Sequence, residues 1–461
     1  MKEICVQGLG FVGAAMAVAI ADAVKQDGEP LYRVIGVDQT GVESRRRINS
    51  LNEGHFPFRC RDDRLLKATS NAHSRGNLCA TTDEEVYSSA DIIVVDINLD
   101  LELESEEPQL ELSGFTKAMR SIFSRAKPGC LVLVETTVPP GTCEKVVIPI
   151  KHQELKNRGL RDDTVLVAHS YERVMPGDYY LDSIKNYWRV FSGETPKAAE
   201  VCEKFLKSVI NTDDYPLTRL NSLTASETAK VMENTYRAVN IALIDEWTKY
   251  AETVGIDLFE VIDAIRLRPT HANMMLPGVG VGGYCLTKDP SFAPLAMRQL
   301  YKSVQDDFPF SNLAIEVNHE MPSHTLDRLT RLLDSDLREK KILIMGVAYR
   351  PNIADTRYSP VQSLVQLLEG RTSIVSIYDP LVSKWSEMGR NTLGTMPDAK
   401  DYDAIIFAIA HDEFRFMDFQ EWLKEGTAMV LDACNLFSEI ERTRCRELGN
   451  RIESIGRGDG L

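Results

Sequence analysis

The sequence predicts an α/β fold made of two Rossmann-like, doubly wound domains, which are joined by a long central helix and a helical linker domain. Short apolar runs alternate with helical stretches near both ends of the chain. A glycine-rich turn, Gly8–Gly13, directly follows the first of these runs. In the middle, the segment from Leu223 to Gly255 has a helical pattern without an internal glycine or proline. These three observations favour two sheet domains around a helical spine.

The N-terminal third contains five apolar runs that we expect to be strands. They are Ile4–Gln7, Tyr32–Val37, Asp91–Ile97, Cys130–Glu135 and Val165–His169. Continuous apolar runs of this length are typical of parallel strands that are covered on both faces. The small-residue stretch Ala14–Val24 is expected to be the helix after the first strand. Alternation of strands and helices implies crossover connections.

The last third repeats this order after a helical region that we expect from Ser291 to about Leu333. Its predicted strands are Lys341–Met345, Ile374–Tyr378, Ala404–Ala410 and Met429–Leu431. Only the N-terminal unit carries a full glycine fingerprint. The chain has 461 residues, and at roughly 150 residues per domain this length predicts about three domains. We place them at residues 1–215, 216–333 and 334–461.

The composition argues against several classes of protein. A formal net charge of −15 disfavours nucleic-acid binding, which needs basic patches. No apolar stretch approaches the roughly 20 residues of a membrane span, and the N-terminus lacks the features of a signal peptide. Nine cysteines without a CxxC pair indicate reduced thiols, so we expect a cytoplasmic protein. No cluster has metal-ligand spacing, so no metal site is expected.

The glycine turn predicts a dinucleotide site. In Gly8-x-Gly10-x-x-Gly13 the glycines allow a tight turn, and the helix that follows presents free N–H groups to a pyrophosphate. Asp38 ends the second predicted strand, where a carboxylate accepts ribose hydroxyls and repels a 2′-phosphate. We therefore expect NAD rather than NADP. The expected cofactor site comprises Gly8, Gly10, Phe11, Val12, Gly13 and Asp38.

A second candidate is Cys285, which lies in a loop with four glycines just before it. A flexible loop lets the backbone approach a ligand, and the cation at Lys288 would favour a thiolate nucleophile. A small buried thiol is the alternative interpretation.

Other candidates lie on the central helix and at strand ends. Lys230 and Asn234 share one helical face, either as functional groups or as part of a solvated surface. Thr136, Thr137 and Val138 follow one predicted strand, and Glu172 with Arg173 follows another. Glu172 is either a general base or an ion-pair partner of Arg173.

Together these motifs resemble the family of UDP-glucose/GDP-mannose dehydrogenases. Members carry a glycine fingerprint, a Thr-Val-Pro-Pro-Gly-Thr turn, a Glu-Arg segment, a Lys-x-x-x-Asn helix, a Gly-Gly-x-Cys-x-x-Lys-Asp loop and a late Tyr-Arg…Asp-Thr-Arg stretch. The matching segments here are Gly8–Gly13, Thr137–Thr142, Glu172-Arg173, Lys230 with Asn234, Gly282–Asp289 and Tyr349–Arg357. They cover nearly the whole chain, and the cysteine loop is the most specific of them.

The resemblance implies an NAD-dependent enzyme that oxidises the C6 alcohol of a nucleotide sugar to a uronate in four electrons, through a thiohemiacetal and a thioester on Cys285. By the same resemblance, Lys230 and Asn234 stabilise oxyanions, Asp289 accepts a proton, and Glu172 is the base for hydrolysis with Thr137 holding water. Further cofactor contacts are implied for Thr136, Val138, Lys288 and Arg357. Substrate contacts are implied for Arg173, Arg268, Gly280, Gly282, Gly283, Tyr349 and Arg350. A homodimer or higher homo-oligomer is also implied, with Arg268 reaching the sugar nucleotide of a neighbouring subunit.

Three segments depart from the family pattern. Tyr171 stands where a proline usually precedes the glutamate. The segment 96–99, Asp-Ile-Asn-Leu, lacks the usual Thr-Pro pair and leads into an acidic stretch, 100–107. The run 432–435, Asp-Ala-Cys-Asn, lacks a common arginine. These departures affect the residues that are expected to line the nicotinamide site and to bind the nucleotide.

Two other functions are compatible with a Rossmann unit beside a helical domain. One is a two-electron dehydrogenase of the 6-phosphogluconate or 3-hydroxyacyl-CoA type, which needs neither the cysteine loop nor a second Rossmann-like unit. The other is a catalytically silent NAD-binding sensor. The sequence leaves the sugar and the nucleotide open, although the segments around Cys285 and Glu172 look more like those of members acting on UDP-N-acetylhexosamines.

Overall fold

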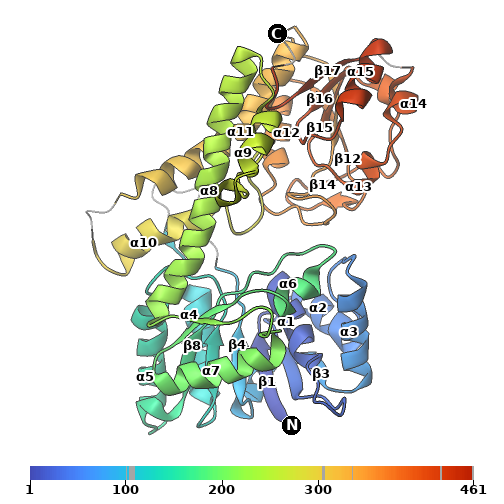
Figure 1. The fold of residues 1–461 in the computed structure, drawn as a ribbon. Coiled ribbons are helices and arrows are strands. Elements are labelled where there is room, and N and C mark those ends of the chain that lie inside the picture. The colour runs from blue at the N-terminus through green and yellow to red at the C-terminus, as the bar shows by residue number, and fades with distance from the viewer. Residues whose placement is uncertain (100, 103–108, 304–306, 335, 426–427, 459–461) are drawn as a thin grey trace. The chain divides into compact units, whose positions relative to one another are not determined.

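The computed structural model describes residues 1–461 except 100, 103–108, 304–306, 335, 426–427 and 459–461. Most of the acidic stretch 100–107 therefore lies outside the described residues. The described chain forms two compact units (Figure 1). The first contains residues 1–232 and 291–307, and the second contains residues 233–290 and 308–461. The segment 216–333 is thus divided between the units, and the expected three-domain division stays a prediction.

An eight-stranded sheet forms the centre of the first unit. Its strand order is β10-β9-β8-β7-β4-β1-β2-β3, and every neighbouring pair is parallel except β8 with β9. The strands are β1 (Lys2–Gln7), β2 (Tyr32–Val37), β3 (Leu78–Thr81), β4 (Ile92–Val95), β7 (Leu131–Val134), β8 (Leu166–His169), β9 (Val190–Gly193) and β10 (Thr218–Arg219). The five strands expected in this region are present, and their central residues are buried as the apolar runs predict.

Helices cover both faces of this sheet (Figure 1). The principal helices packed on one face are α1 (Phe11–Ala21), α3 (Asp63–Ser74), α6 (Tyr180–Lys185) and α7 (Pro196–Val209). The other face packs against α4 (Ser113–Arg125) and α5 (Ile148–Asn157). Alternate strand residues point into the two cores, which is the doubly wound arrangement expected from the sequence.

The first helix differs from its expected bounds of Ala14–Val24. Gly10 has an extended backbone and α1 begins directly after it at Phe11. The helix ends at Ala21, and Val24 instead forms a β-bridge with Pro30. Apolar composition could not show this end, because Val24 continues the apolar run although it pairs with Pro30, six residues later. The start at Phe11 places the glycine turn against the helix N-terminus.

The second unit contains a five-stranded, fully parallel sheet of order β12-β11-β15-β16-β17. Its strands are β11 (Lys341–Met345), β12 (Ile374–Tyr378), β15 (Ala404–Phe407), β16 (Met429–Asp432) and β17 (Arg451–Ser454). Helices α11 (Pro309–Leu332) and α12 (Pro360–Gly370) cover one face. The other face packs against α13 (Asp412–Arg415), α14 (Phe419–Leu423) and α15 (Glu439–Glu447). Both sheets confirm the predicted fold class.

Two expectations for this region were wrong in detail. Four strands were expected to complete the second sheet, but β17 adds a fifth strand. Its sequence, Arg-Ile-Glu-Ser, carries two charged residues and so lacks the apolar run that marks the others. The helical region 291–333 is also not continuous, since α10 (Phe292–Gln299) and α11 are separate helices.

The long helix α8 (Leu223–Val254) matches its expected bounds closely. Residues 223–232 belong to the first unit and residues 233–254 to the second. No helix among the described residues is long and apolar enough to span a membrane. The described side chains also contain no group of three or more His, Cys, Asp or Glu residues arranged to hold a metal ion.

Candidate active site

In the glycine turn of the first unit, only the middle glycine, Gly10, has room for an added Cβ. A Cβ on Gly8 would lie 2.2 Å from the backbone oxygen of Asp96, and one on Gly13 would lie 1.9 Å from the oxygen of Gly8. A Cβ on Gly10 would meet nothing nearer than the Asn98 side chain at 4.0 Å. The outer glycines therefore allow close packing of β1, β4 and α1, and Gly10 faces open space.

This turn fits the pyrophosphate of NAD. Helix α1 begins after Gly10 with no side-chain cap and no acidic residue in its first turn, so the positive end of its dipole suits an anion. Phe11 and Val12 are partly exposed at that helix start, and the Phe11 ring stacks on Phe58 with centroids 4.1 Å apart. β1 and β4 are adjacent here, and their carboxyl ends border the crevice where such sheets bind dinucleotides.

Asp38 follows β2 as expected, but its carboxylate already has partners. Arg47 of helix α2 (Val42–Asn52) contacts Asp38 Oδ2 at 2.8–3.0 Å, and the Gln39 N–H donates to Oδ1 at 2.9 Å. Asp38 is 8% exposed and Arg47 is 19% exposed. A bound ribose would share this carboxylate with Arg47, because each carboxylate oxygen can accept more than one hydrogen bond.

We expect wild-type protein to prefer NAD, and Asp38→Asn to improve the relative efficiency with NADP. The substitution removes the charge that repels a 2′-phosphate and releases Arg47 to meet it. Hydrogen bonds to charged groups contribute about 1.5–3 kcal/mol, so the NADP/NAD ratio of kcat/KM should rise roughly 10- to 100-fold. Steady-state kinetics with both cofactors measure this ratio. Equal efficiency of the wild type with NADP would refute the role of Asp38.

The segment that follows β7 is hydrogen-bonded to the end of the neighbouring strand β4. The Thr136 hydroxyl donates to Val95 O at 3.1 Å and accepts from Ile97 N at 2.9 Å, so it joins the ends of β7 and β4. Val138 is buried and Thr137 is partly exposed. Of the three residues, Thr137 is therefore placed best for contact with a ligand.

The structure brings Glu172 and Lys230 together in the first unit. Lys230 Nζ donates to the backbone oxygen of Glu172 at 2.8 Å and lies 3.7 Å from Oε1. The Glu172 Oε2 atom accepts from the backbone N–H of Val174. Both side chains are at least nine-tenths buried, so the pair is held away from bulk solvent. Glu172 therefore contacts Lys230 rather than being only a partner of Arg173.

Tyr171, where the family usually has proline, is buried between two cations. Lys230 Nζ lies 5.4 Å from its ring centroid and Arg173 Cζ lies 5.2 Å from it. Arg173 also donates to the Tyr171 hydroxyl at 3.2 Å and to the Trp188 backbone oxygen at 2.6 Å. The departure is therefore accommodated by cation–π contacts that stabilise both cations.

The first turns of α8 are attached to the strand ends by buried polar groups. Glu227 accepts from the backbone N–H groups of Gly141 and Cys143 at 2.6 and 2.7 Å. The Ser226 hydroxyl lies 2.7 Å from His169 Nδ1. Burial raises the pKa of Glu227 to about 7. Burial, together with the charge of Lys230, lowers the pKa of His169 to about 3, so this imidazole is neutral at pH 7.

We expect the difference in unfolding free energy between the wild type and Glu227→Gln to depend on pH. Because the folded-state pKa is raised from 4.5 to about 7, the wild type gains protons on folding between these values. Its stability relative to the variant is highest below pH 4.5 and is lost as pH rises towards 7, by on the order of 3 kcal/mol. Denaturant unfolding of both proteins at pH 5 and pH 8 measures this change. A difference that does not vary with pH would contradict the assignment.

In the second unit, the cysteine loop packs closely on the segment after β11. A Cβ on Gly282 or Gly283 would lie 2.6–2.7 Å from Tyr349, and one on Gly280 would lie 2.6 Å from Pro360. These glycines therefore provide close approach of the loop backbone to Tyr349 and Pro360. Cys285 is partly exposed, and its backbone oxygen accepts from Asp289 N at 2.9 Å. The thiol thus lies at the start of a helical turn.

Asp289 is fully buried between two donors. Asn234 Nδ2 donates to Asp289 Oδ2 at 2.7 Å, and Lys288 Nζ donates to Oδ1 at 3.0 Å. Lys288 is 2% exposed and lies 4.3 Å from the Tyr284 ring centroid. The structure therefore brings Asn234 and Asp289 together, and it places Lys288 as an ion-pair partner of Asp289.

The remaining expected substrate and cofactor residues of the second unit differ in their surroundings. Arg357 makes a two-pronged ion pair with Asp355, with contacts of 2.8–3.2 Å, and lies 5.5 Å from the Tyr284 ring centroid. Arg350 and Arg268 are exposed. Exposure leaves these two arginines accessible to a ligand or to a second chain.

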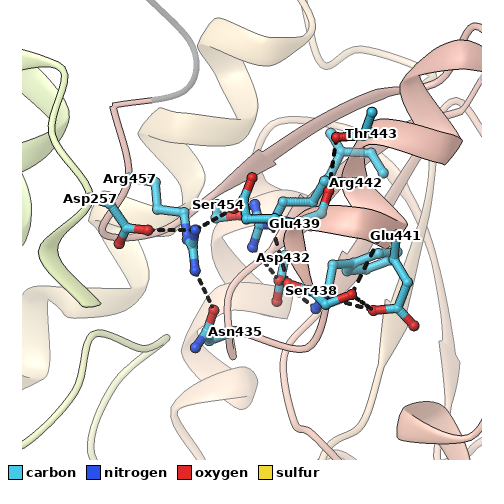
Figure 2. A network of polar contacts seen from close by, with 12 residues as sticks. Asp257, Asp432, Asn435, Ser438, Glu439, Glu441, Arg442, Thr443, Ser454 and Arg457 are labelled. Carbon is cyan, nitrogen blue, oxygen red and sulfur yellow. Dashed lines mark hydrogen bonds and ion pairs between the residues drawn. The ribbon is translucent and has the colours of Figure 1, made fainter. Parts of the chain in front are cut away.

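The segment 432–435, where the family commonly has an arginine, forms a network of polar contacts (Figure 2). Asp432 accepts from the backbone N–H groups of residues 434, 436 and 437, and from buried Arg442 at 3.0 Å. Arg457, from the segment after β17, donates to Asn435 at 3.0 Å and pairs with Asp257 at 2.5 Å. Arg442 therefore neutralises Asp432, and Arg457 holds Asn435 by a hydrogen bond.

Asp96, Arg189 and Glu227 were not predicted as site residues, and Glu135 was expected only as the start of a candidate segment at a strand end. Asp96 and Glu135 directly follow the apolar strands β4 and β7, and Arg189 pairs with Glu135 at 3.0 Å in a buried contact. The position that marked Glu135 could also have identified Asp96, since the carboxyl edge of a parallel sheet is where ligands bind. No local pattern marks Arg189, which is brought to Glu135 from 54 residues away.

Comparisons with known proteins agree with this organisation. Family models of the UDP-glucose/GDP-mannose dehydrogenase family match residues 2–210 (NAD binding domain), 224–320 (central domain) and 343–439 (UDP binding domain). The UDP-N-acetyl-D-mannosamine dehydrogenase of Pyrococcus horikoshii is 31% identical, over 99% of this chain and 100% of the relative. The UDP-N-acetyl-D-glucosamine 6-dehydrogenase of Pseudomonas aeruginosa is 29% identical, over 92% and 94%.

Solved structures show the same likeness. The structure of the Pyrococcus horikoshii UDP-D-ManNAc dehydrogenase matches with a TM-score of 0.82 and 29% identity, over 99% of this chain and 100% of that chain. With all three family models matched in order, the resemblance drawn from the motifs is confirmed. The chain belongs to the UDP-glucose/GDP-mannose dehydrogenase family and is an NAD-dependent oxidoreductase.

Proposed function

We propose that the protein oxidises the C6 alcohol of a UDP-N-acetylhexosamine to the carboxylate, in four electrons and through a thioester on Cys285. The observation that carries this proposal is the hydrogen bond from Asn234 to the buried carboxylate of Asp289. Asp289 lies four residues after Cys285, which is partly exposed. It is supported by relatives that are named for UDP-N-acetyl-D-mannosamine and UDP-N-acetyl-D-glucosamine.

The chemistry that NAD supplies when bound is acceptance of a hydride from C6, once in each two-electron step. In the first oxidation Asp289 takes the hydroxyl proton, and the resulting aldehyde carbon is attacked by the Cys285 thiolate. This addition retains the aldehyde, which would otherwise hydrate or diffuse away. Lys230 and Asn234 donate to the oxyanion, and such a donor typically contributes about 3 kcal/mol.

Release of the product needs water. After the second oxidation the acyl carbon is bonded to the Cys285 sulfur as a thioester. Glu172 takes a proton from a water that Thr137 orients, while the water oxygen bonds to the acyl carbon and the C–S bond breaks. Lys230, which contacts both the backbone and the carboxylate of Glu172, holds this base in place.

One experiment separates this proposal from the alternatives. NAD reduction is measured with UDP-glucose, UDP-N-acetylglucosamine, UDP-N-acetylmannosamine and GDP-mannose, and the NADH formed per sugar is counted. We expect turnover with a UDP-N-acetylhexosamine and two NADH per sugar. One NADH per sugar would support a two-electron dehydrogenase, and NAD binding without turnover would support a silent sensor.

We also propose a homodimer through helix α8. Tyr236, Leu243, Trp247, Tyr250 and Val254 lie on one face of α8, and each is 46–54% exposed. Their spacing of seven, four, three and four residues forms an apolar stripe along the helix. An exposed stripe of this kind is typical of a protein interface.

The dimer is tested with Trp247→Glu, which places a charge in the stripe. We expect the variant to be monomeric by sedimentation at micromolar concentration, because an unpaired buried charge is strongly unfavourable at an interface. Thr253→Glu, on an exposed position of the same helix outside the stripe, is the matched control and should remain dimeric. A dimeric Trp247→Glu protein would exclude this face as the interface.

A further inference from the structure

The second unit repeats the start of the first unit up to the acid that follows its second strand. Gly346 follows β11 with a φ of 91° and donates its N–H to the last residue of β12 at 2.8 Å. Gly8 follows β1 with a φ of 94° and donates to the last residue of β2, also at 2.8 Å. Asp379, which follows β12, therefore corresponds to Asp38, which follows β2. In Rossmann folds the acid at this position binds a ribose.

Asp379 is bonded instead to the backbone of its own unit. Its Oδ2 accepts from the N–H groups of Val347 at 2.8 Å and Ala348 at 3.3 Å. Its Oδ1 accepts from the N–H groups of residues 381 and 382 at 2.9 and 3.0 Å. The side chain is fully buried. This carboxylate thus anchors the backbone that follows β11, because each of its oxygens is already engaged by N–H donors.

His411 extends this anchor to the other end of the same loop. Its Nε2 lies 3.3 Å from Asp379 Oδ2, and its Nδ1 accepts from the backbone N–H of Asn352 at 3.0 Å. A backbone N–H can only donate, so Nδ1 is an acceptor and Nε2 carries the proton. The Asn352 side chain in turn accepts from the N–H of Asp412 at 3.0 Å. Because His411 is only 1% exposed, water does not compete for these contacts.

The loop between the two anchors carries two of the expected substrate residues. Tyr349 and Arg350 lie between Ala348, which is bonded to the acid, and Asn352, which is bonded to the imidazole. Arg350 is exposed, and the Tyr349 ring packs on the cysteine loop, where an added Cβ on Gly283 would lie 2.7 Å from it. The family model that matches residues 343–439 is a UDP binding domain. The anchored loop therefore belongs to the nucleotide-binding part of the chain.

We propose that His411 is a positioning residue, which holds Tyr349 and Arg350 for binding of the substrate's nucleotide. Asp379 fixes the imidazole, and the imidazole fixes the loop through the N–H of Asn352. A ligand that meets a loop already held in its binding conformation loses less freedom on binding, so the anchor raises affinity. The inference rests on the proposed function, in which the substrate is a UDP-sugar. His411 acts through the loop and takes no part in hydride transfer or thioester chemistry.

Two substitutions separate the two hydrogen bonds of His411. Glutamine places its amide near the Nε2 position, so His411→Gln keeps a donor to Asp379 but loses the acceptor for the Asn352 N–H. Asparagine places its oxygen near the Nδ1 position, so His411→Asn keeps this acceptor but loses the donor to Asp379. The loop is held through the Asn352 contact, so we expect glutamine to impair nucleotide binding and asparagine to preserve it.

Binding of UDP by the wild type and by each variant is measured by calorimetry. His411→Gln should bind UDP roughly 3- to 10-fold more weakly, as expected from the loss of one hydrogen bond, and His411→Asn should stay within about two-fold of the wild type. With the UDP-sugar that the enzyme oxidises, the KM of His411→Gln should rise by the same factor. Its kcat should not change, because the residues proposed for catalysis are intact.

Ser373→Ala is the matched control for loss of a buried hydrogen bond in the same unit. The Ser373 hydroxyl donates to the backbone oxygen of Leu337 at 2.9 Å, and both residues precede strands of this sheet, at the edge opposite to the anchored loop. We expect this variant to unfold at lower denaturant concentration and to bind UDP as the wild type does. A purely structural role for His411 would make His411→Gln behave in the same way.

Equal weakening of UDP binding in both His411 variants, or wild-type affinity in His411→Gln, would overturn the inference. Either result leaves the proposed function intact if the wild type binds UDP and forms two NADH per sugar. If His411→Gln alone weakens UDP binding but the wild type forms one NADH per sugar, the anchor stands and the four-electron oxidation fails. A wild-type protein that does not bind UDP would contradict both.

Discussion

Cys285→Ser is expected to abolish the four-electron oxidation. A serine hydroxyl is far less acidic than a thiol and a poorer nucleophile, so the aldehyde is no longer trapped as a covalent adduct. The backbone turn should survive, because it depends on the Cys285 carbonyl oxygen and the N–H of Asp289 rather than on the sulfur. Hydride transfer itself does not need the thiol, so low-level formation of aldehyde can persist.

The measurement is the carboxylate formed per sugar nucleotide, together with aldehyde captured by a hydrazine reagent. Cys60→Ser serves as the control, since Cys60 is another partly exposed thiol, which accepts from Asp62 N at 3.3 Å, a contact that serine can keep. It should retain wild-type turnover. Full oxidation to the carboxylate by Cys285→Ser would refute the thioester mechanism.

Glu172→Gln is expected to slow deacylation and leave both oxidations fast. General-base catalysis is typically worth about 10²–10⁴-fold, so the variant should form a burst of about two NADH per active site and then turn over slowly. The glutamine oxygen can still accept from the Val174 N–H, which preserves the local fold. Intact-protein mass spectrometry should show the sugar nucleotide attached to Cys285.

The competing interpretation makes Glu172 a structural partner of Lys230 and of the backbone. It predicts a lower unfolding free energy, without burst or adduct. Glu203→Gln, which removes a partly exposed carboxylate paired with Lys207 on α7, controls for loss of a surface charge and should show neither burst nor loss of activity. A folded Glu172→Gln protein with normal steady-state turnover would remove Glu172 from the mechanism.

The local sequence predicted the bounds of an element correctly where the burial of that element depends on its own residues. The strands Tyr32–Val37, Lys341–Met345 and Ile374–Tyr378 have the bounds that their apolar runs predict. Helix α8 also begins at the expected residue. The buried positions of these strands are apolar, so the run itself contains the information.

Elements whose stability depends on distant partners were predicted less well. β17 pairs with β16 although two of its four residues are charged. Its Glu453 is stabilised by Arg328 of α11 at 3.1 Å, a contact between residues far apart in the chain. The expected end of the first helix was wrong for a different reason, because a local pairing of Val24 with Pro30, six residues later, replaces the last turn of the expected helix.

The sequence by itself determined the fold class, the order of the strands along the chain, the cofactor turn and the identity of the candidate nucleophile. These follow from apolar runs, glycine spacing and the order of motifs, all of which are local. Only the tertiary structure decided the partners of the candidate groups: Arg47 on Asp38, Lys230 on Glu172 and Asn234 on Asp289. It also placed His411 between Asp379 and Asn352. The role of a buried polar group depends on which groups fold beside it, and parallel pairing brings those groups together from strands that are dozens of residues apart.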